Sequence, residues 1–159
     1  MRALAPWYYY VAQLWGLGRL PGAPGTWGSL GAVAVFIPLQ MFCPEPALSV
    51  VVVAVVLLSF PICNWASAYM GQWDPDNVVY DELAGQWLAL WPMVWLEFWP
   101  NPWWGFLAGF FLFRFFDIIK IFPANRFDRM ENGYGITLDD IMAGIYANLC
   151  LTGIGFWLL

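Results

Sequence analysis

VVVVAVVLLSF, residues 50–60, is an apolar run interrupted only by Ser59. It lies within residues 46–73, a longer segment that contains no Asp, Glu, Lys or Arg. As an α-helix, a segment of this length can cross the hydrocarbon core of a bilayer, which is about 30 Å thick. The sequence therefore predicts a membrane-spanning helix here.

The composition of the whole chain agrees with a membrane protein. Of its 159 residues, 62% are hydrophobic and only 11% are charged, whereas soluble domains carry about 25% charged residues. A disordered chain is excluded because disorder requires low hydrophobicity and high charge. The net charge of -5 argues against a nucleic-acid partner, since nucleic-acid binders present a basic face. The length fits a single membrane-embedded domain, residues 1–159.

Four further apolar segments are expected to span the membrane, at about residues 28–42, 83–98, 103–116 and 141–159. The first of them is short. Residues 7–15 are aromatic and mixed in polarity, which suits a helix lying at the membrane interface. We therefore predict an all-α fold, a small polytopic membrane helix bundle of about five apolar helices preceded by an N-terminal interfacial helix.

The charges sort to one side of this arrangement. Five spans place the N-terminus and the segments 71–81 and 117–140 on the same side of the membrane. All six basic residues fall on that side: Arg2, Arg19, Arg114, Lys120, Arg126 and Arg129. The opposite turns, which contain the proline pairs 44/46 and 100/102, carry only Glu45 and Glu97. The positive-inside rule places the basic side in the cytoplasm.

Nine of the eleven acidic residues also lie on that side, and several lie at the ends of predicted spans: Asp81, Glu82, Asp117, Asp139 and Asp140. Carboxylates at a membrane boundary are costly unless they are hydrated, paired or bound to a cation. Helix capping is the alternative explanation for Asp81 and Asp139. It accounts for one acid per helix start and not for Asp117 at a helix end, where the dipole disfavours an anion.

A hard divalent cation would stabilise such a group of acids. Magnesium takes oxygen ligands and uses one or two carboxylates together with substrate phosphate. A zinc site is not expected, because the chain has no histidine and its three cysteines lack metal-binding spacing. The sequence therefore predicts an all-oxygen Mg²⁺ site.

Basic residues and a glycine-rich segment accompany the acids. Arg114, Asp117 and Lys120 follow one another at intervals of three, which suits one edge of a helix. These charges either form ion pairs that set the topology or clamp a phosphate. GLGRLPGAPGTWGS, residues 16–29, would let backbone approach an anion before a helix that Thr26 or Ser29 could cap. The segment lacks the GK[ST] ending of a Walker motif.

Five motifs together resemble a known family. They are PGAPGTWGSL (21–30), VVYDELAGQW (78–87), FRFFDIIKIFP (113–123), NRFDR (125–129) and GYGITLDDIMAG (133–144). In this order they resemble the phosphatidylglycerophosphatase A family, over about residues 16 to 147. Members of this family remove the terminal phosphate of phosphatidylglycerophosphate, giving phosphatidylglycerol, in a magnesium-dependent reaction at the bacterial inner membrane.

The resemblance also implies roles for individual residues. It assigns Asp81, Glu82, Asp117 and the pair Asp139/Asp140 to the metal site. It assigns Arg114, Lys120 and Arg126 to the substrate phosphate, with Thr26 and Ser29 nearby. The family commonly has proline after the lysine of the third motif, whereas Ile121 stands here, which leaves the placement of Lys120 open.

From these residues we formulate a mechanism as a hypothesis. Mg²⁺ bound by Asp81, Glu82, Asp117 and Asp140 would neutralise the phosphate and activate a water molecule. Arg114 and Lys120 would stabilise the transferring group, and either Asp139 or Asp128 would accept the proton of the water. Direct attack by water is preferred over an aspartyl-phosphate intermediate, because the DxDx[TV] motif of the phosphatases that use one is absent.

Two other classes of function compete with a phosphatase. A divalent-cation transporter or channel would use the acids as a filter, but it would need acids at mid-membrane depth and a path to the opposite side. A structural subunit of a membrane complex would use the small-residue stripes, such as Ala143, Gly144 and Ala147, and would leave the acids unexplained. The sequence leaves open the oligomeric state, the number of metal ions and the selectivity among lipid phosphates.

Overall fold

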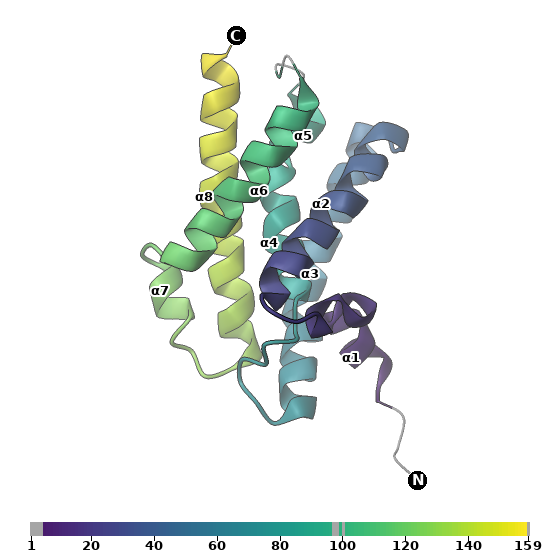
Figure 1. The fold of residues 1–159 in the computed structure, drawn as a ribbon, viewed down its shortest axis with the longest axis vertical. Helices are drawn as coiled ribbons and strands as arrows, with labels where there is room; N and C mark the ends of the chain where they lie inside the picture. Colours follow the sequence, from purple (N-terminus) through teal and green to yellow (C-terminus); the bar gives the residue numbers. More distant parts are fainter. Residues whose placement is uncertain (1–4, 97–98, 100, 159) are drawn as a thin grey trace.

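The computed structural model of the protein describes residues 5–96, 99 and 101–158, and their regular secondary structure is helical, with no strand among them. The expected features at positions 2, 97, 98, 100 and 159 lie outside the described residues. The helices are α1 (Trp7–Ala12), the 3₁₀ helix η1 (Leu14–Arg19), α2 (Pro24–Phe42), α3 (Glu45–Met70), α4 (Tyr80–Leu90), α5 (Pro92–Trp95), α6 (Pro102–Ile119), α7 (Ala124–Phe127) and α8 (Gly133–Trp157) (Figure 1).

Three of the described helices, α2, α3 and α6, are long and apolar enough to cross a membrane. Each of these helices begins at or next to a proline. Pro24 and Pro102 occupy first-turn positions, and Pro44 immediately precedes α3. A first-turn proline is favourable because its missing N–H would have no helical partner there. α8 has 25 residues but is not among these three helices. The predicted all-helical class is confirmed for the described residues, and three helices could cross a membrane where about five spans were expected.

Three predicted spans differ from the structure. The last, expected at 141–159, begins eight residues earlier, because α8 starts at Gly133. The first is not short, because α2 begins at Pro24, four residues before the expected start, and has 19 residues. The third, expected at 83–98, is not one helix: α4 ends at Leu90 and α5 begins at Pro92. Proline cannot donate the backbone hydrogen bond that would continue a helix. The 11 residues of α4 extend for only about 16 Å, too short to cross a bilayer alone.

The expected interfacial helix at residues 7–15 is also shorter than predicted. α1 ends at Ala12, and the chain then turns through Leu14 and Trp15, whose φ angles are positive at 46° and 54°. The aromatic side chains of α1 pack on α3, with the rings of Tyr8 and Trp65 5.9 Å apart. The N-terminal segment is therefore fixed to the bundle and continues directly into η1.

α4 lies in the centre of the bundle, with nine of its eleven residues buried. It packs most extensively against α8 and also contacts α2, α3 and α6. Glycines permit the close approach: a Cβ on Gly144 would lie 2.5 Å from the carbonyl oxygen of Gly85, and one on Gly85 would lie 2.6 Å from that of Asp140. The small residues of α8 thus allow α4 to pack closely against it. This packing places the start of α4 beside Asp139 and Asp140 of α8.

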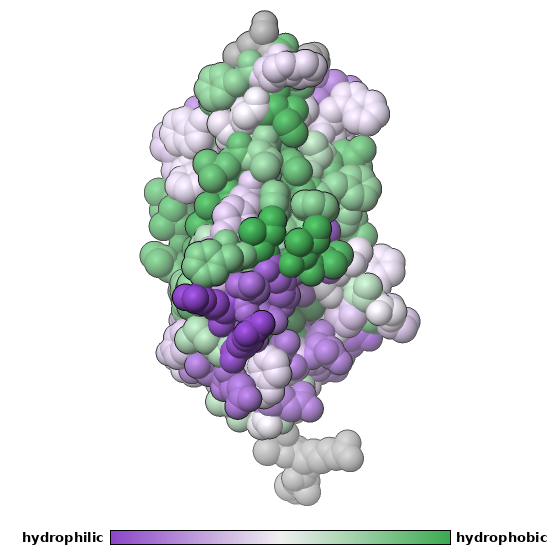
Figure 2. Space-filling model, turned by 90° about the vertical axis from the view of Figure 1, so that its left-hand side faces the viewer, coloured by the Kyte–Doolittle hydropathy of each residue, from purple (hydrophilic) through white to green (hydrophobic). Residues whose placement is uncertain are grey.

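The charged segments gather at one end of the molecule. In Figure 1 the N-terminus and the α3–α4 and α6–α8 connections lie at the lower end, whereas the α2–α3 turn and the C-terminus lie at the upper end. Figure 2 shows hydrophilic residues concentrated in the lower part of one face and apolar residues covering the part above. The predicted separation of charges is confirmed for the described residues.

Candidate active site

A cavity of about 800 Å³ opens near the charged end. Its walls come from the glycine-rich segment 18–25, the loop 74–78, and helices α4, α6 and α8. Among the described residues, seven carboxylates line it: Asp74, Asp76, Asp81, Glu82, Asp117, Asp139 and Asp140. The basic residues of the lining are Arg19, Arg114 and Lys120. The cavity therefore has a strong excess of negative charge.

Three of these carboxylates form a compact group. Asp81 and Glu82 come from the first turn of α4, and Asp140 lies two turns into α8. One carboxylate oxygen from each lies within 4.8 Å of the others. The Oε2 atom of Glu82 is buried and has no hydrogen-bond partner among the described residues. An all-oxygen donor set with an unpartnered buried oxygen fits a hard divalent cation, which would also offset the cost of crowding three acids.

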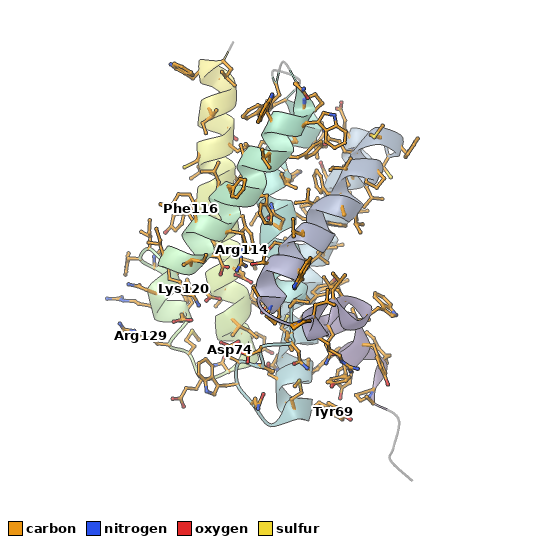
Figure 3. All side chains as sticks on the ribbon, in the orientation of Figure 1. Tyr69, Asp74, Arg114, Phe116, Lys120 and Arg129 are labelled. Carbon is orange, nitrogen blue, oxygen red and sulfur yellow. The ribbon has the colours of Figure 1, made fainter. Side chains whose placement is uncertain are left out.

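Asp117, the fourth predicted metal ligand, lines the same cavity but is not part of this group of three. It forms an ion pair with Arg114, one turn earlier on α6, with 2.6 Å between Oδ2 and Nη1. Both side chains are largely buried. Figure 3 labels Arg114 in the interior of the bundle, where its side chain lies near those of the neighbouring helices. The cation offsets the unfavourable position of an anion in the last turn of a helix.

Lys120 ends α6 and turns back toward the acids. It takes the left-handed conformation, with φ at 50°, and its N–H donates to Phe116. Its Nζ donates to Asp139 Oδ2 at 2.6 Å and also pairs with Asp128. Burial lowers the pKa of Lys120, but the hydrogen bonds and negative charges of Asp128 and Asp139 outweigh burial and raise the pKa above its ordinary value. Lys120 thus reaches the cavity although Ile121 follows it.

The structure separates the neighbouring acids of α8. Asp140 belongs to the group of three, whereas Asp139 pairs with Lys120. Adjacent helical residues project about 100° apart, so different partners are the expected outcome. Helix capping explains neither residue, because α8 begins at Gly133 and its N-cap is Asn132.

Other predicted site residues lie outside the cavity lining: Thr26, Ser29, Arg126 and Asp128. The guanidinium of Arg126 lies over the Phe122 ring, 4.8 Å from its centroid. Ser29 is fully buried, and its hydroxyl donates to the Gly25 carbonyl at 2.9 Å. Neither Thr26 nor Ser29 caps α2, because the helix begins earlier and its N-cap is Ala23.

Sequence reasoning missed three charged residues of the lining, Arg19, Asp74 and Asp76. The two acids flank Pro75 in the loop before α4, and Figure 3 labels Asp74 near the charged end. Burial raises the pKa of Asp74, and the positive charge of Lys120 partly opposes this rise. Asp74 and Asp76 could have been included as candidates from the sequence, because both lie in a connection on the charged side of the predicted bundle.

Gly25 provides a test of the position of Glu82. A Cβ at this residue would collide with the Glu82 carboxylate and lie 3.1 Å from Arg114 Nη1. Because the colliding atoms end flexible side chains, α2 can keep its course while Glu82 moves. We expect Gly25→Ala to lower kcat/KM about 10–100-fold, as for changes to groups that orient metal ligands, without changing the unfolding temperature. Gly153→Ala, where a Cβ meets open space, is the control; equal activity of both variants would contradict this prediction.

Fold and site together define a helical membrane protein with an acidic cavity at its charged end. The family model described as Phosphatidylglycerophosphatase A matches residues 10–155. The chain belongs to this family of lipid phosphatases of phospholipid synthesis. The predicted family and the enzymatic interpretation are thereby confirmed.

Relatives share most of the chain. A Haemophilus influenzae protein named phosphatidylglycerophosphatase A is 37% identical over 152 residues, covering 95% of this chain and 90% of its own. An Escherichia coli protein of the same name is 36% identical over 152 residues, covering 94% and 84%. A Bacteroides thetaiotaomicron protein provisionally named phosphatidylinositol-3-phosphatase is 34% identical over 147 residues, covering 91% and 90%. No solved structure matches the chain.

Proposed function

We propose that the protein hydrolyses the terminal phosphomonoester of phosphatidylglycerophosphate, giving phosphatidylglycerol, and requires Mg²⁺ held by Asp81, Glu82 and Asp140. One observation carries the metal requirement: three carboxylate oxygens from two helices lie within 4.8 Å of one another in the cavity. The family supports the reaction and the substrate.

Electrostatics supports a cation in this cavity. The substrate is a phosphate anion, and the described lining has seven carboxylates against three basic side chains. Two of those basic side chains, Arg114 and Lys120, are already paired with acids. A phosphate would therefore be repelled from the cavity unless further positive charge were present. A divalent cation at the group of three acids supplies that charge.

In this proposal, different residues have different roles in hydrolysis. Mg²⁺ bound there would offset charge on the phosphate oxygens and make a water molecule more acidic. Arg114, which lines the cavity and is held by Asp117, donates to the phosphate. Lys120 stabilises charge on the transferring group.

A carboxylate must also accept the proton of the attacking water. Of the two candidates, Asp139 lines the cavity and Asp128 does not, so we assign this role to Asp139. Asp128 forms a second ion pair with Lys120. Arg126, Thr26 and Ser29 have no direct role in this proposal, because none of them lines the cavity.

The location follows from the charges. We place the charged end at the cytoplasmic face of a bacterial inner membrane, which the chain crosses several times. The basic residues near that end, Arg19, Lys120, Arg126 and Arg129, satisfy the positive-inside rule. A phosphomonoester at the headgroup level of the cytoplasmic leaflet then meets the cavity without leaving the membrane surface.

The test is release of phosphate by detergent-purified protein from phosphatidylglycerophosphate, with Mg²⁺ or with EDTA. We expect release with Mg²⁺, loss of release in EDTA and recovery when Mg²⁺ is restored. Release that persists in EDTA would overturn the metal requirement. Faster release from phosphatidylinositol 3-phosphate would overturn the substrate while keeping the reaction class. Acid quenching with labelled substrate should leave no phosphate on the protein, whereas a phosphorylated protein would contradict direct attack by water.

A further inference from the structure

Arg19 is the third basic residue of the cavity lining, and it comes from the glycine-rich segment rather than from the helices that carry the acids. Its Nε donates to Oε1 of Gln13 at 2.6 Å. Its guanidinium lies 5.5 Å from the centroid of the Tyr9 ring. Because Gln13 is only 1% exposed, the guanidinium is tied to a fixed part of the molecule.

Arg19 differs from the other two basic residues in its electrostatic partners. Arg114 is paired with Asp117, and Lys120 with two aspartates. Among the described residues, no carboxylate lies within ion-pair distance of Arg19, and its hydrogen-bond partner is a neutral amide. Its two terminal Nη groups make no hydrogen bond within the described chain. Its positive charge is thus available to an anion in the cavity.

The backbone around Arg19 is held in place from two sides. The carbonyl of Gln13 accepts hydrogen bonds from the N–H groups of Gly16 and Gly18. Gly18 lies so close to the Asn77 carbonyl that a Cβ would collide with it. The segment therefore rests against the loop before α4, and Arg19 occupies a defined part of the wall. Such preorganisation lowers the entropy lost when a ligand binds.

The proposed substrate carries two phosphates, separated by a glycerol unit. The terminal phosphomonoester is the group that Arg114, Lys120 and the group of three acids would handle. The phosphodiester, which joins that glycerol to the lipid, carries a further negative charge and has no partner among those groups. A second cation on a separate wall of the same cavity matches this chemistry, because guanidinium donates two parallel hydrogen bonds to phosphate oxygens.

We propose that Arg19 binds the phosphodiester of the substrate and thereby favours lipids that carry a second phosphate beside the one removed. This inference rests on the proposed function. Arg19 contributes to substrate binding and not to the chemical step, which depends on residues of α4, α6 and α8 and on Lys120.

The experiment compares Arg19→Gln with Arg129→Gln. Both arginines are exposed, but Arg129 lies outside the cavity lining, so its substitution removes the same charge elsewhere. Phosphate release is measured in mixed micelles at varied mole fractions of phosphatidylglycerophosphate, and inorganic phosphate serves as a competing ligand for the terminal-phosphate site. For Arg19→Gln we expect a KM about tenfold higher, as for loss of a charge-assisted hydrogen bond, with kcat and phosphate inhibition within twofold of wild type. Arg19→Lys should recover part of the KM, and Arg129→Gln should match wild type.

Other results would overturn the inference. An unchanged KM in Arg19→Gln means that the side chain does not bind substrate. If Arg19→Gln weakens substrate binding and phosphate inhibition equally, Arg19 binds the terminal phosphate instead. If Arg129→Gln raises KM as much as Arg19→Gln does, the effect is a general one of charge at the membrane surface. A fall in kcat that Arg19→Lys does not restore assigns Arg19 a structural role. If wild type releases no phosphate with Mg²⁺, the proposed function itself fails, which is distinct from all of these results.

Discussion

Asp140→Asn is expected to lower phosphate release about 10²–10³-fold at saturating Mg²⁺, the cost of removing an electrostatic group that acts on the transition state. Asp140 is the contribution of α8 to the group of three acids, and the other two acids come from α4. An amide keeps the size of the side chain and removes its charge, so the packing of α4 against α8 should persist. The measurement is kcat/KM over a range of Mg²⁺ concentrations.

Thermal unfolding gives a second measurement of the same substitution. A cation that binds only the folded state raises the unfolding temperature as its concentration rises, so wild type should be stabilised by Mg²⁺ and Asp140→Asn much less. In EDTA, where no cation is bound, wild type should lose this advantage in unfolding temperature. Removing one of three crowded negative charges relieves repulsion, so the variant should then be at least as stable as wild type.

Glu131→Gln is the control, because Glu131 is exposed at the same end of the molecule and does not line the cavity. It should leave activity and the Mg²⁺ effect unchanged. Equal stabilisation of wild type and Asp140→Asn by Mg²⁺ would contradict the assignment of this residue to the metal. Unfolding of the variant in EDTA below the wild-type temperature would indicate a structural role instead.

Lys120→Met is expected to lower kcat about 10²-fold, within the range measured when one donor to a transition state is removed. The substitution leaves Asp139, which is only 5% exposed, without its cation. An uncompensated buried carboxylate favours its protonated form, and a protonated Asp139 cannot accept the proton of water. Lys120→Arg should retain more activity, since it keeps the charge.

Asp128→Asn separates the two candidate proton acceptors. It removes one partner of Lys120 and keeps the pair between Lys120 and Asp139. We expect a loss of less than about tenfold, because an ion pair this exposed contributes little. A loss as large as that of Asp139→Asn would identify Asp128 as the acceptor and contradict our assignment.

The pH dependence of the Lys120 effect follows from its raised pKa. The pKa of Lys120 is raised in the folded state above its ordinary value of 10.5, so its charge stabilises the fold fully below that pH. This stability is lost as the pH rises through the raised pKa. From pH 6 to pH 9 the residue stays charged. Wild type and Lys120→Arg should therefore have pH–activity profiles of the same shape in this range, because neither side chain changes charge there, and assays from pH 6 to pH 9 check this.

The sequence carried strong information on the long helices and on the gathering of charge. α3 follows from a charge-free segment of sufficient length. The acids at the edges of the apolar segments lie on one cavity because the α3–α4 and α6–α8 connections are at the same end of the molecule. Two of them, Asp139 and Asp140, could also be expected to have different partners from helix geometry alone. These features depend on local composition and on periodicity.

Other features depend on contacts between distant segments, which local patterns do not contain. The burial of α4 relies on the fit of Gly85 against Gly144, so a helix too short to span the membrane can still lie in the bundle centre. The turn at Leu14 and Trp15 has no strong local signal, because positive φ is uncommon for such side chains. The place of Arg19 in the cavity follows from that turn and was not predictable from its neighbours.

The short, centrally buried α4 has a consequence for the order in which the protein is made. Asp81 and Glu82 leave the ribosome well before Asp140, on a helix that is too short to remain in the bilayer by itself. α4 acquires its main packing partner only when α8 has been synthesised. Under the proposed function, the group of three acids is therefore complete only when α8 has been made, and a chain truncated before Gly133 lacks both Asp140 and the main packing partner of α4.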